Sequence, residues 1–271
     1  MKFTILGASG FIGSHLVAHL RSMGIEVFSP GRDDPSVFYQ KLGHVIYCIG
    51  LTADFRKRPF ETVRAHVCHL LDFLERANKI DSLLYLSSTR LYAKSDSCRE
   101  DTILRVNPTD TDDLYNLSKM MGESVCLARV LPSVRIVRLS NVYGNDFSST
   151  NFLSAILKDA INKKKVILRT ALASEKDYIS IDDVVNILPQ IAQLGRHRLY
   201  NIASGVNVSN KALLDLVIKA TGSKVEVMEG AELVKFPLID ISKARDEFGF
   251  SPSPLHDSFD NLINELKDKS K

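Results

Sequence analysis

The 271-residue sequence lacks the marks of a membrane protein, a metalloprotein or a nucleic-acid-binding protein. No apolar run reaches the roughly 18 residues that a membrane-spanning helix requires. The four cysteines form no CxxC pair, so zinc ribbons and thioredoxin-type chemistry are without support, and we expect no metal site. The formal net charge is only +3, and no Lys/Arg cluster lies beside aromatic residues, which argues against a nucleic-acid partner.

A secretory signal and a disulfide framework are also missing. The first apolar run, residues 3–6, is followed at once by a glycine and is too short for a signal peptide. The spacing of the cysteines gives no reason to expect disulfides, which suits a reducing compartment. We therefore expect a cytoplasmic protein.

The composition, 45% hydrophobic and 25% charged, is that of an ordinary globular protein. Short apolar runs alternate with helical patterns along the first half of the chain. Strands are expected at 3–6, 25–28, 44–49, 83–86 and 134–139, and helices at 12–23, 64–77 and 114–129. Because strands separated by helices form βαβ units, the sequence predicts an α/β fold with a Rossmann-type doubly wound parallel sheet.

After about Gly144 this alternation weakens. Helical patterns remain at 152–162, 182–194 and 211–221, with short strands at 166–168 and 199–202. We expect a dinucleotide-binding domain at 1–145 and a smaller C-terminal α/β substrate lobe at 146–271, some of whose elements return to the first domain. The polar tail, residues 262–271, is expected to fray.

A glycine-rich turn follows the first expected strand and opens the first expected helix. Its GxxGxxG pattern consists of Gly7, Gly10 and Gly13, and Phe11 and Ile12 begin the helix. The first glycine permits a tight turn, the second lets the backbone approach a pyrophosphate, and the third lets helix and strand pack closely. The helix N-terminus would then offer N–H groups to phosphates. The pattern predicts dinucleotide binding, and a tight turn without a ligand is the alternative.

The residues after the second expected strand bear on the choice between NAD and NADP. An acidic residue at that strand end would bind the adenosine ribose. No carboxylate stands there, and Arg32, which follows shortly, could pair with a 2′-phosphate. This favours NADP, although Asp33 and Asp34 keep NAD possible and Arg32 could equally be a solvated surface residue.

Tyr115 and Lys119 stand four residues apart on one face of an expected helix. A free tyrosine has a pKa near roughly 10, and a neighbouring ammonium favours its phenolate form. An isolated YxxxK pair is common and usually carries no function. Here Ser88 ends a preceding strand, and the carboxyl end of a parallel strand lies at the ligand edge of an open α/β sheet.

With these residues the chain resembles the extended short-chain dehydrogenase/reductase superfamily, and more narrowly its NAD(P)-dependent epimerase/dehydratase family. The resemblance runs nearly from end to end. It covers the glycine turn, the Ser88 strand, the Tyr115 helix, the RxxNxYG segment 138–144, the segment 177–183, and the later segments 200–205 and 248–252.

The resemblance implies roles for individual residues. Ser88, Tyr115 and Lys119 match the catalytic positions, and the last two also the cofactor site. Further cofactor contacts are implied near the nicotinamide ribose, at Cys48, Ile49 and Gly50. Substrate contacts are implied at Ser88, Thr89 and Asn141. The family also implies a homodimer built from the helices at 64–77 and 114–129.

Several departures from the family pattern matter. The segment between the second and third expected strands is short, so a further strand usual in the family is expected to be missing, along with its adenine contact. Dehydratases of the family follow the Ser/Thr with an Asp-Glu pair, whereas this chain has Thr89 and Arg90, which argues against a 4,6-dehydratase. Lys176 replaces a frequent arginine, and His66 replaces a usual asparagine, where a packing or surface role is favoured over ligand contact.

The leading interpretation is an NAD(P)-dependent epimerase or keto-reductase that acts on a nucleotide sugar, with Tyr115 as acid/base. One alternative is a reductase of another carbonyl compound. A second alternative, of a different class, is a catalytically silent NADP-sensing protein.

Overall fold

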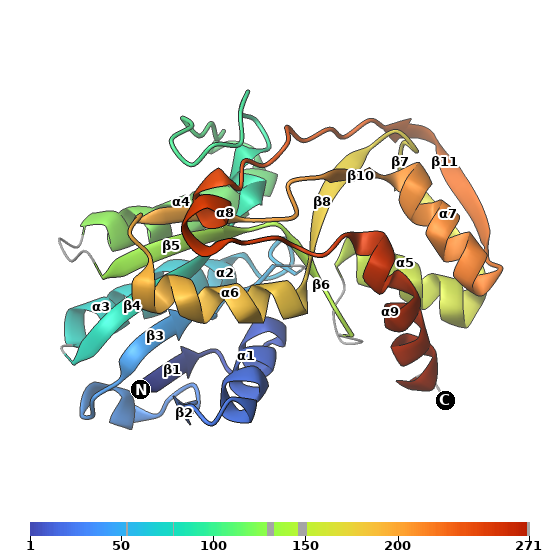
Figure 1. Cartoon of the computed structure of the whole chain (residues 1–271). Coiled ribbons are helices and arrows are strands. Elements are labelled where there is room, and N and C mark those ends of the chain that lie inside the picture. Colours follow the sequence, from blue (N-terminus) through green and yellow to red (C-terminus); the bar gives the residue numbers. More distant parts are fainter. Residues whose placement is uncertain (53, 78, 129–132, 146–150, 270–271) are drawn as a thin grey trace.

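The structure, a computed structural model, describes residues 1–52, 54–77, 79–128, 133–145 and 151–269 (Figure 1). Its largest sheet has six strands: β1 (Lys2–Leu6), β2 (Glu26–Phe28), β3 (Gly43–Tyr47), β4 (Ile80–Ser88), β5 (Val134–Leu139) and β9 (Leu199–Ile202). All neighbouring strands are parallel, in the order β2-β1-β3-β4-β5-β9. The expected Rossmann-type parallel sheet is confirmed.

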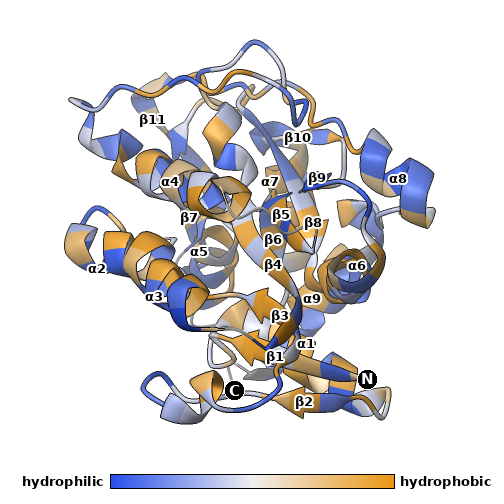
Figure 2. Ribbon diagram, turned by 90° about the vertical axis from the view of Figure 1, so that its left-hand side faces the viewer, coloured by the Kyte–Doolittle hydropathy of each residue, from blue (hydrophilic) through white to orange (hydrophobic). Residues whose placement is uncertain are grey.

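Helices cover both faces of this sheet (Figure 2). On one face lie α1 (Phe11–Ser22) and α6 (Ile181–Leu194), and their apolar residues pack against strand residues such as Ile46 and Val137. On the other lie α3 (His69–Arg76) and α4 (Leu114–Ala128), which pack on residues such as Val45 and Tyr85. Burial on both faces explains the nearly continuous apolar runs of the strands, since each fully buried aliphatic side chain contributes about 1.5–3 kcal/mol.

The helix expected at 64–77 is longer than the sequence predicts and is irregular. It begins with α2 (Pro59–Val63), passes through a π-helical turn, η2 (Arg64–Cys68), and continues as α3. Turns of this kind bulge one residue out of the regular ladder and recur at functional sites. Here the turn carries His66, whose side chain is fully buried.

The segment between β2 and β3 contains no strand, as expected. It holds a short 3₁₀ turn, η1 (Pro35–Phe38), in which the Asp34 carboxylate accepts a hydrogen bond from the Ser36 backbone N–H at 2.9 Å. Prolines and glycine in this segment do not favour a strand. Among the described residues, β2 is therefore an edge of the large sheet.

The remaining elements form a smaller lobe beside the carboxyl edge of the sheet (Figure 1). It has a parallel pair, β7 (Lys165–Thr170) and β11 (Lys224–Glu232), packed with α5 (Phe152–Lys158), α7 (Asn210–Thr221) and α9 (Leu255–Lys269). A three-stranded sheet connects the two parts: β10 (Asn207–Ser209), β8 (Glu175–Ser180) and β6 (Asn141–Tyr143). A short helix, α8 (Ser242–Phe248), returns to pack beside β9.

The expected fraying of the tail is wrong for the described residues. Helix α9 continues to Lys269, and Leu262, Ile263 and Leu266 are buried in the core of the smaller lobe. Their spacing places them on one helix face, and the charged residues between them face solvent. No helix among the described ranges is long and apolar enough to cross a membrane.

Candidate active site

In the glycine turn between β1 and α1, packing requires some of the glycines but not all of them. Gly7 has a φ of +85°, and a Cβ there would lie 2.9 Å from the Ile49 backbone nitrogen. A Cβ on Gly13 would collide with the Gly7 carbonyl and lie 2.9 Å from the Cα of Ala8. Gly10 is different, because its φ is −81° and an added Cβ would lie 3.4 Å from the Gly7 oxygen. The protein's own packing therefore requires glycine at positions 7 and 13, but not at 10.

The N-terminus of α1 is suited to an anion. No side chain caps it, and its first turn, which Phe11 and Ile12 begin, contains no acidic residue. The first N–H groups of a helix have no partner within the helix, and they carry a partial positive charge. Uncapped N–H groups beside a glycine that packing does not require fit the pyrophosphate of a dinucleotide.

Cys48, Ile49 and Gly50 follow β3 at the carboxyl edge of the sheet, beside this turn. The Cys48 backbone N–H donates to the Leu6 carbonyl at 2.8 Å, which holds the two strand ends together. A Cβ on Gly50 would lie 3.5 Å from the Lys119 Nζ. The segment thus connects the glycine turn with the lysine of the YxxxK pair, as a cofactor spanning both would require.

Ser88 and Tyr115 meet at the end of β4. Tyr115 is 3% exposed, and the side chains of Ser88 and Thr52 lie close enough to its phenol to lower its pKa by hydrogen bonding. Burial raises the pKa of Tyr115, while those two hydrogen bonds and the positive charge of Arg90 oppose the increase. The Arg90 guanidinium carbon lies 5.5 Å from the centre of the Tyr115 ring.

Lys119 is buried one helical turn further along α4. Its Nζ donates to the Leu86 carbonyl at 2.8 Å, and burial lowers the pKa of Lys119 to about 8. The sequence predicts that this ammonium stabilises the Tyr115 phenolate, and that role stays a prediction; the positive charge of Arg90 also lowers the pKa of the phenol. Lys119 faces Gly50 and the strand end, where a cofactor ribose would lie.

His66, on the π-helical turn, connects the segment after β3 with α4 through hydrogen bonds. Its Nε2 accepts a hydrogen bond from the Leu51 N–H at 3.2 Å, and its Nδ1 lies 2.8 Å from the Ser118 hydroxyl. Ser118 in turn donates to the Tyr115 carbonyl, so the proton of the imidazole belongs on Nδ1. Burial lowers the pKa of His66 to about 2, which keeps the ring neutral. The packing role favoured for His66 fits this geometry.

The other expected site residues lie on three separate segments. Thr89 is buried within the 3₁₀ turn η3 (Thr89–Tyr92). Asn141 begins β6, and its side-chain amide donates to the Asp177 carbonyl at 2.8 Å. Arg32 is exposed on the segment after β2.

Three side chains around the site lie outside the expected set. Thr52 and Arg90 both lower the pKa of Tyr115, and the charge of Arg90 also lowers the pKa of Lys176 of β8. A hydroxyl residue shortly after Gly50, at the carboxyl end of a parallel strand, is a signal by which Thr52 could have been found. In the sequence, Arg90 and Lys176 are noticeable only because they depart from the family pattern.

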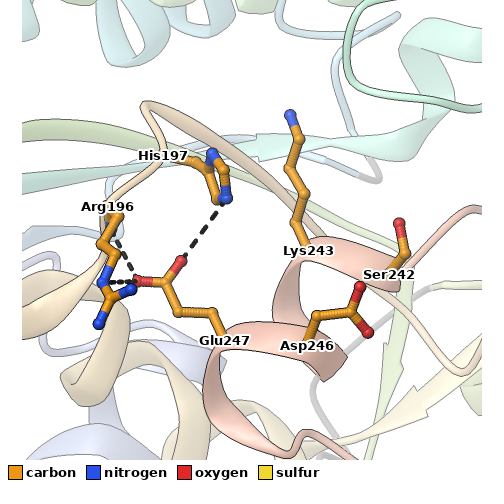
Figure 3. A pocket seen from close by; sticks show the side chains of 6 residues that line it. All are labelled: Arg196, His197, Ser242, Lys243, Asp246 and Glu247. Atoms are coloured by element: carbon orange, nitrogen blue, oxygen red, sulfur yellow. Dashed lines mark hydrogen bonds and ion pairs between the residues drawn. The ribbon is translucent and has the colours of Figure 1, made fainter.

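A separate hollow lies at the opposite end of the sheet, before β9 (Figure 3). Its lining includes Glu247, which accepts hydrogen bonds from the Arg196 N–H at 2.8 Å and from the Tyr200 hydroxyl at 2.6 Å. None of the expected site residues lines it. Ligands of open α/β sheets bind at the carboxyl ends of the strands, so this hollow is not the candidate site.

Residues 3–203 match the NAD dependent epimerase/dehydratase family. This match spans well over half of the chain, and the protein therefore belongs to that family. It is an enzyme of the group that comprises NAD-dependent epimerases, dehydratases and reductases.

Two relatives align along nearly the whole chain. The dTDP-4-dehydro-6-deoxy-D-allose reductase of a Streptomyces species is 24% identical over 93% of this chain and 91% of its own. The UDP-glucose 4-epimerase of Lactobacillus helveticus is 24% identical over 97% of this chain and 95% of its own. The structure of MoeE5 in complex with UDP-glucose and NAD has a TM-score of 0.85 at 20% identity and covers 100% of both chains. This likeness confirms the fold.

The geometry of the glycine turn generates a first prediction. Gly10→Val fits the protein's own packing but places a branched side chain where a pyrophosphate would approach. We expect titration with NAD⁺ and NADP⁺ to detect no binding, while the melting temperature stays close to that of the unmodified protein. Gly13→Val is the matched control, because its collision with the Gly7 carbonyl should lower the melting temperature as well. Unchanged cofactor binding by Gly10→Val would contradict the assignment.

Proposed function

We propose that the protein is an NAD(P)-dependent epimerase or keto-reductase of a nucleotide sugar, with Tyr115 as the acid/base. The observation that carries the proposal is the buried Tyr115 phenol beside Ser88, one helical turn from Lys119, whose Nζ faces Gly50. The names of the two relatives, a 4-dehydro sugar reductase and a 4-epimerase, favour reaction at carbon 4 of the sugar.

Each residue of the site has a distinct role in this proposal. As a phenolate, which the positive charge of an oxidised nicotinamide would favour, Tyr115 would take the proton of a sugar hydroxyl during oxidation, and as a phenol it would return that proton during reduction. Ser88 hydrogen-bonds the same oxygen and orients it. Lys119 binds the cofactor ribose, and Asn141 and Thr89 contact the sugar. The nicotinamide, when bound, accepts or donates the hydride.

The reaction class depends on whether the cofactor returns the hydride to the sugar from which it came. An epimerase returns the hydride to the same sugar, whereas a reductase releases an oxidised cofactor. Thr89 and Arg90 supply no acid and base for loss of water, so dehydration is disfavoured. Nicotinamide absorbance with a panel of nucleotide sugars separates an epimerase from a keto-reductase. The same panel tests the alternatives, a reductase of another carbonyl compound and a silent NADP sensor.

Tyr115→Phe tests the acid/base role. The variant keeps the ring and its packing but removes the ionisable oxygen. Turnover should fall by a factor of about 10² to 10⁴, the usual share of general acid–base catalysis, with little change in cofactor affinity. Lys119→Met should reduce both turnover and cofactor affinity.

Tyr143→Phe is the matched control for this experiment. Tyr143 is also buried, and its hydroxyl lies 2.6 Å from that of Ser258 in the smaller lobe. Its loss should cost about 1 kcal/mol of stability and leave turnover intact. An active Tyr115→Phe enzyme would end the proposed mechanism, although the cofactor-binding fold would stand.

We also propose that NADP is preferred over NAD. Arg32 is exposed after β2, and the Asp34 carboxylate is engaged by the Ser36 N–H, which leaves only Asp33 to compete for a ribose. Arg32→Ala should weaken NADPH binding selectively, with NADH binding unchanged, in fluorescence titrations of both cofactors. A clear preference of the unmodified protein for NADH would refute this choice.

The organisation of the protein is part of the proposal. We assign cofactor binding to residues 1–145 and substrate binding to 146–271, and place the protein in the cytoplasm. A homodimer through α3 and α4 is supported by apolar side chains on their outer faces, with Leu71 42% exposed and Met121 53% exposed.

Light scattering tests this dimer. The unmodified protein should have a dimer mass at micromolar concentration, and a Leu71→Glu, Met121→Glu double variant should have a monomer mass. Leu194, which is 67% exposed at the end of α6, is the control position, and Leu194→Glu should leave the mass unchanged. A monomer mass for the unmodified protein would refute the dimer.

A further inference from the structure

Arg90 lies beside the proposed acid/base without a partner for its charge. It follows Ser88 by two residues, and its backbone N–H donates to the Ser88 hydroxyl oxygen at 3.2 Å, which fixes the turn. The guanidinium carbon lies 4.9 Å from the centre of the Phe55 ring and 5.5 Å from that of Tyr115. The half-buried side chain forms no hydrogen bond or ion pair with any residue that the structure describes.

A second cation, on the sheet that connects the two parts, lies near enough to Arg90 to feel its charge. Lys176 of β8 lies over the Phe152 ring, with its Nζ 3.9 Å from the ring centre. It is also half-buried, and within the described part of the chain it forms no ion pair. Burial lowers the pKa of Lys176, and the charge of Arg90 lowers it further. Burial likewise lowers the pKa of Arg90.

Arg56, a neighbouring cation, offers a comparison because it is paired with a carboxylate of the protein. Its guanidinium carbon lies 4.6 Å from the Phe55 ring, on the same aromatic side chain that Arg90 contacts. Asp112 accepts two hydrogen bonds from it, one of them at 2.6 Å. Arg56 is therefore paired directly with a carboxylate. Arg90 feels the charges of Asp112 and Asp113 without contacting them, and neither Arg90 nor Lys176 forms an ion pair among the described residues.

Two partly desolvated cations without a counter-ion are costly, and an anionic ligand group would relieve that cost. A guanidinium presents its N–H groups as a planar fork that matches a carboxylate with two parallel hydrogen bonds. We propose that Arg90, assisted by Lys176, binds a carboxylate on the sugar of the substrate, so that the preferred substrate class is a nucleotide-linked uronic acid. This proposal rests on the proposed function, because it takes Tyr115 as the position of the reacting oxygen.

The position of Arg90 favours the sugar carboxylate over the diphosphate of the nucleotide. Reaction at carbon 4 places that carbon against Tyr115 and Ser88. The carboxylate of a hexuronic acid is attached to carbon 5, next to the reacting carbon, and is within reach of a guanidinium stacked on Tyr115. The diphosphate is attached to carbon 1, on the far side of the sugar ring. Arg90 therefore determines specificity for the sugar.

The test compares pairs of ligands that differ only in this carboxylate. UDP-glucuronate and UDP-glucose, and the two corresponding dTDP sugars, are titrated calorimetrically into the protein saturated with cofactor. In at least one pair the unmodified protein should bind the acidic sugar about 10- to 100-fold more tightly, the range of a charged hydrogen bond. Arg90→Gln should remove most of this preference, and Lys176→Gln should reduce it.

Arg56→Gln is the matched control. It removes a cation from the same Phe55 ring, but one that Asp112 already neutralises, and the preference should be unchanged. The melting temperature of Arg90→Gln without ligand should fall only slightly, because Arg90 contributes ring contacts but no ion pair to the described structure. A marked fall would assign Arg90 a structural role and overturn the proposal.

The remaining outcomes separate this proposal from the one on which it rests. If neutral sugars bind and turn over, but no acidic preference exists or Arg90→Gln retains it, only the carboxylate site is refuted. Equal weakening of both members of a pair by Arg90→Gln would assign Arg90 to the diphosphate and also refute it. If no nucleotide sugar binds while the cofactor does, the proposed function itself fails.

Discussion

The buried ion pair between Arg138 and Glu123 is the interaction on which the arrangement of the site depends. The two side chains lie 2.7 Å apart and are each about 5% exposed, and the pair joins β5 to α4, the helix that carries Tyr115 and Lys119. Arg138 also donates to the Tyr92 hydroxyl at 2.7 Å, which holds the turn that follows Ser88. Loss of one partner would leave an uncompensated buried charge, a defect that costs about 3–5 kcal/mol. The conspicuous RxxNxYG segment thus begins with a structural arginine.

At the centre of the site, burial shifts pKa values toward the uncharged forms of the side chains. It raises the pKa of Tyr115, lowers that of Lys119 to about 8, and lowers that of His66 to about 2. At neutral pH the phenol and the imidazole are therefore uncharged, and Lys119 remains mostly protonated. A nearly dry site of this kind strengthens every electrostatic contact with a charged ligand group. The chemistry then depends on charges that the cofactor and substrate bring.

The sequence predicts the parallel sheet well, because apolar periodicity and a glycine turn report local geometry directly. The short segment after β2, compared with the family pattern, raises the question of a missing strand, and the described residues there form none. The sequence fails at α9, where a polar composition hides a stripe of buried residues, including Leu262 and Leu266. Nor does it predict that Arg90 lies against the Tyr115 ring. That contact depends on how η3 packs against α4, which spacing along one chain does not reveal.

The absence of a strand beyond β2 has a kinetic consequence for the cofactor. Because the described sheet ends at β2, the adenine half of a bound dinucleotide would lose the contact area of one strand. The glycine turn would still bind the pyrophosphate. Loss of contact area at one end of a ligand mainly accelerates its dissociation. A short residence time hinders an enzyme that must retain its cofactor through a whole catalytic cycle. It benefits one that exchanges spent cofactor for fresh cofactor at every turnover.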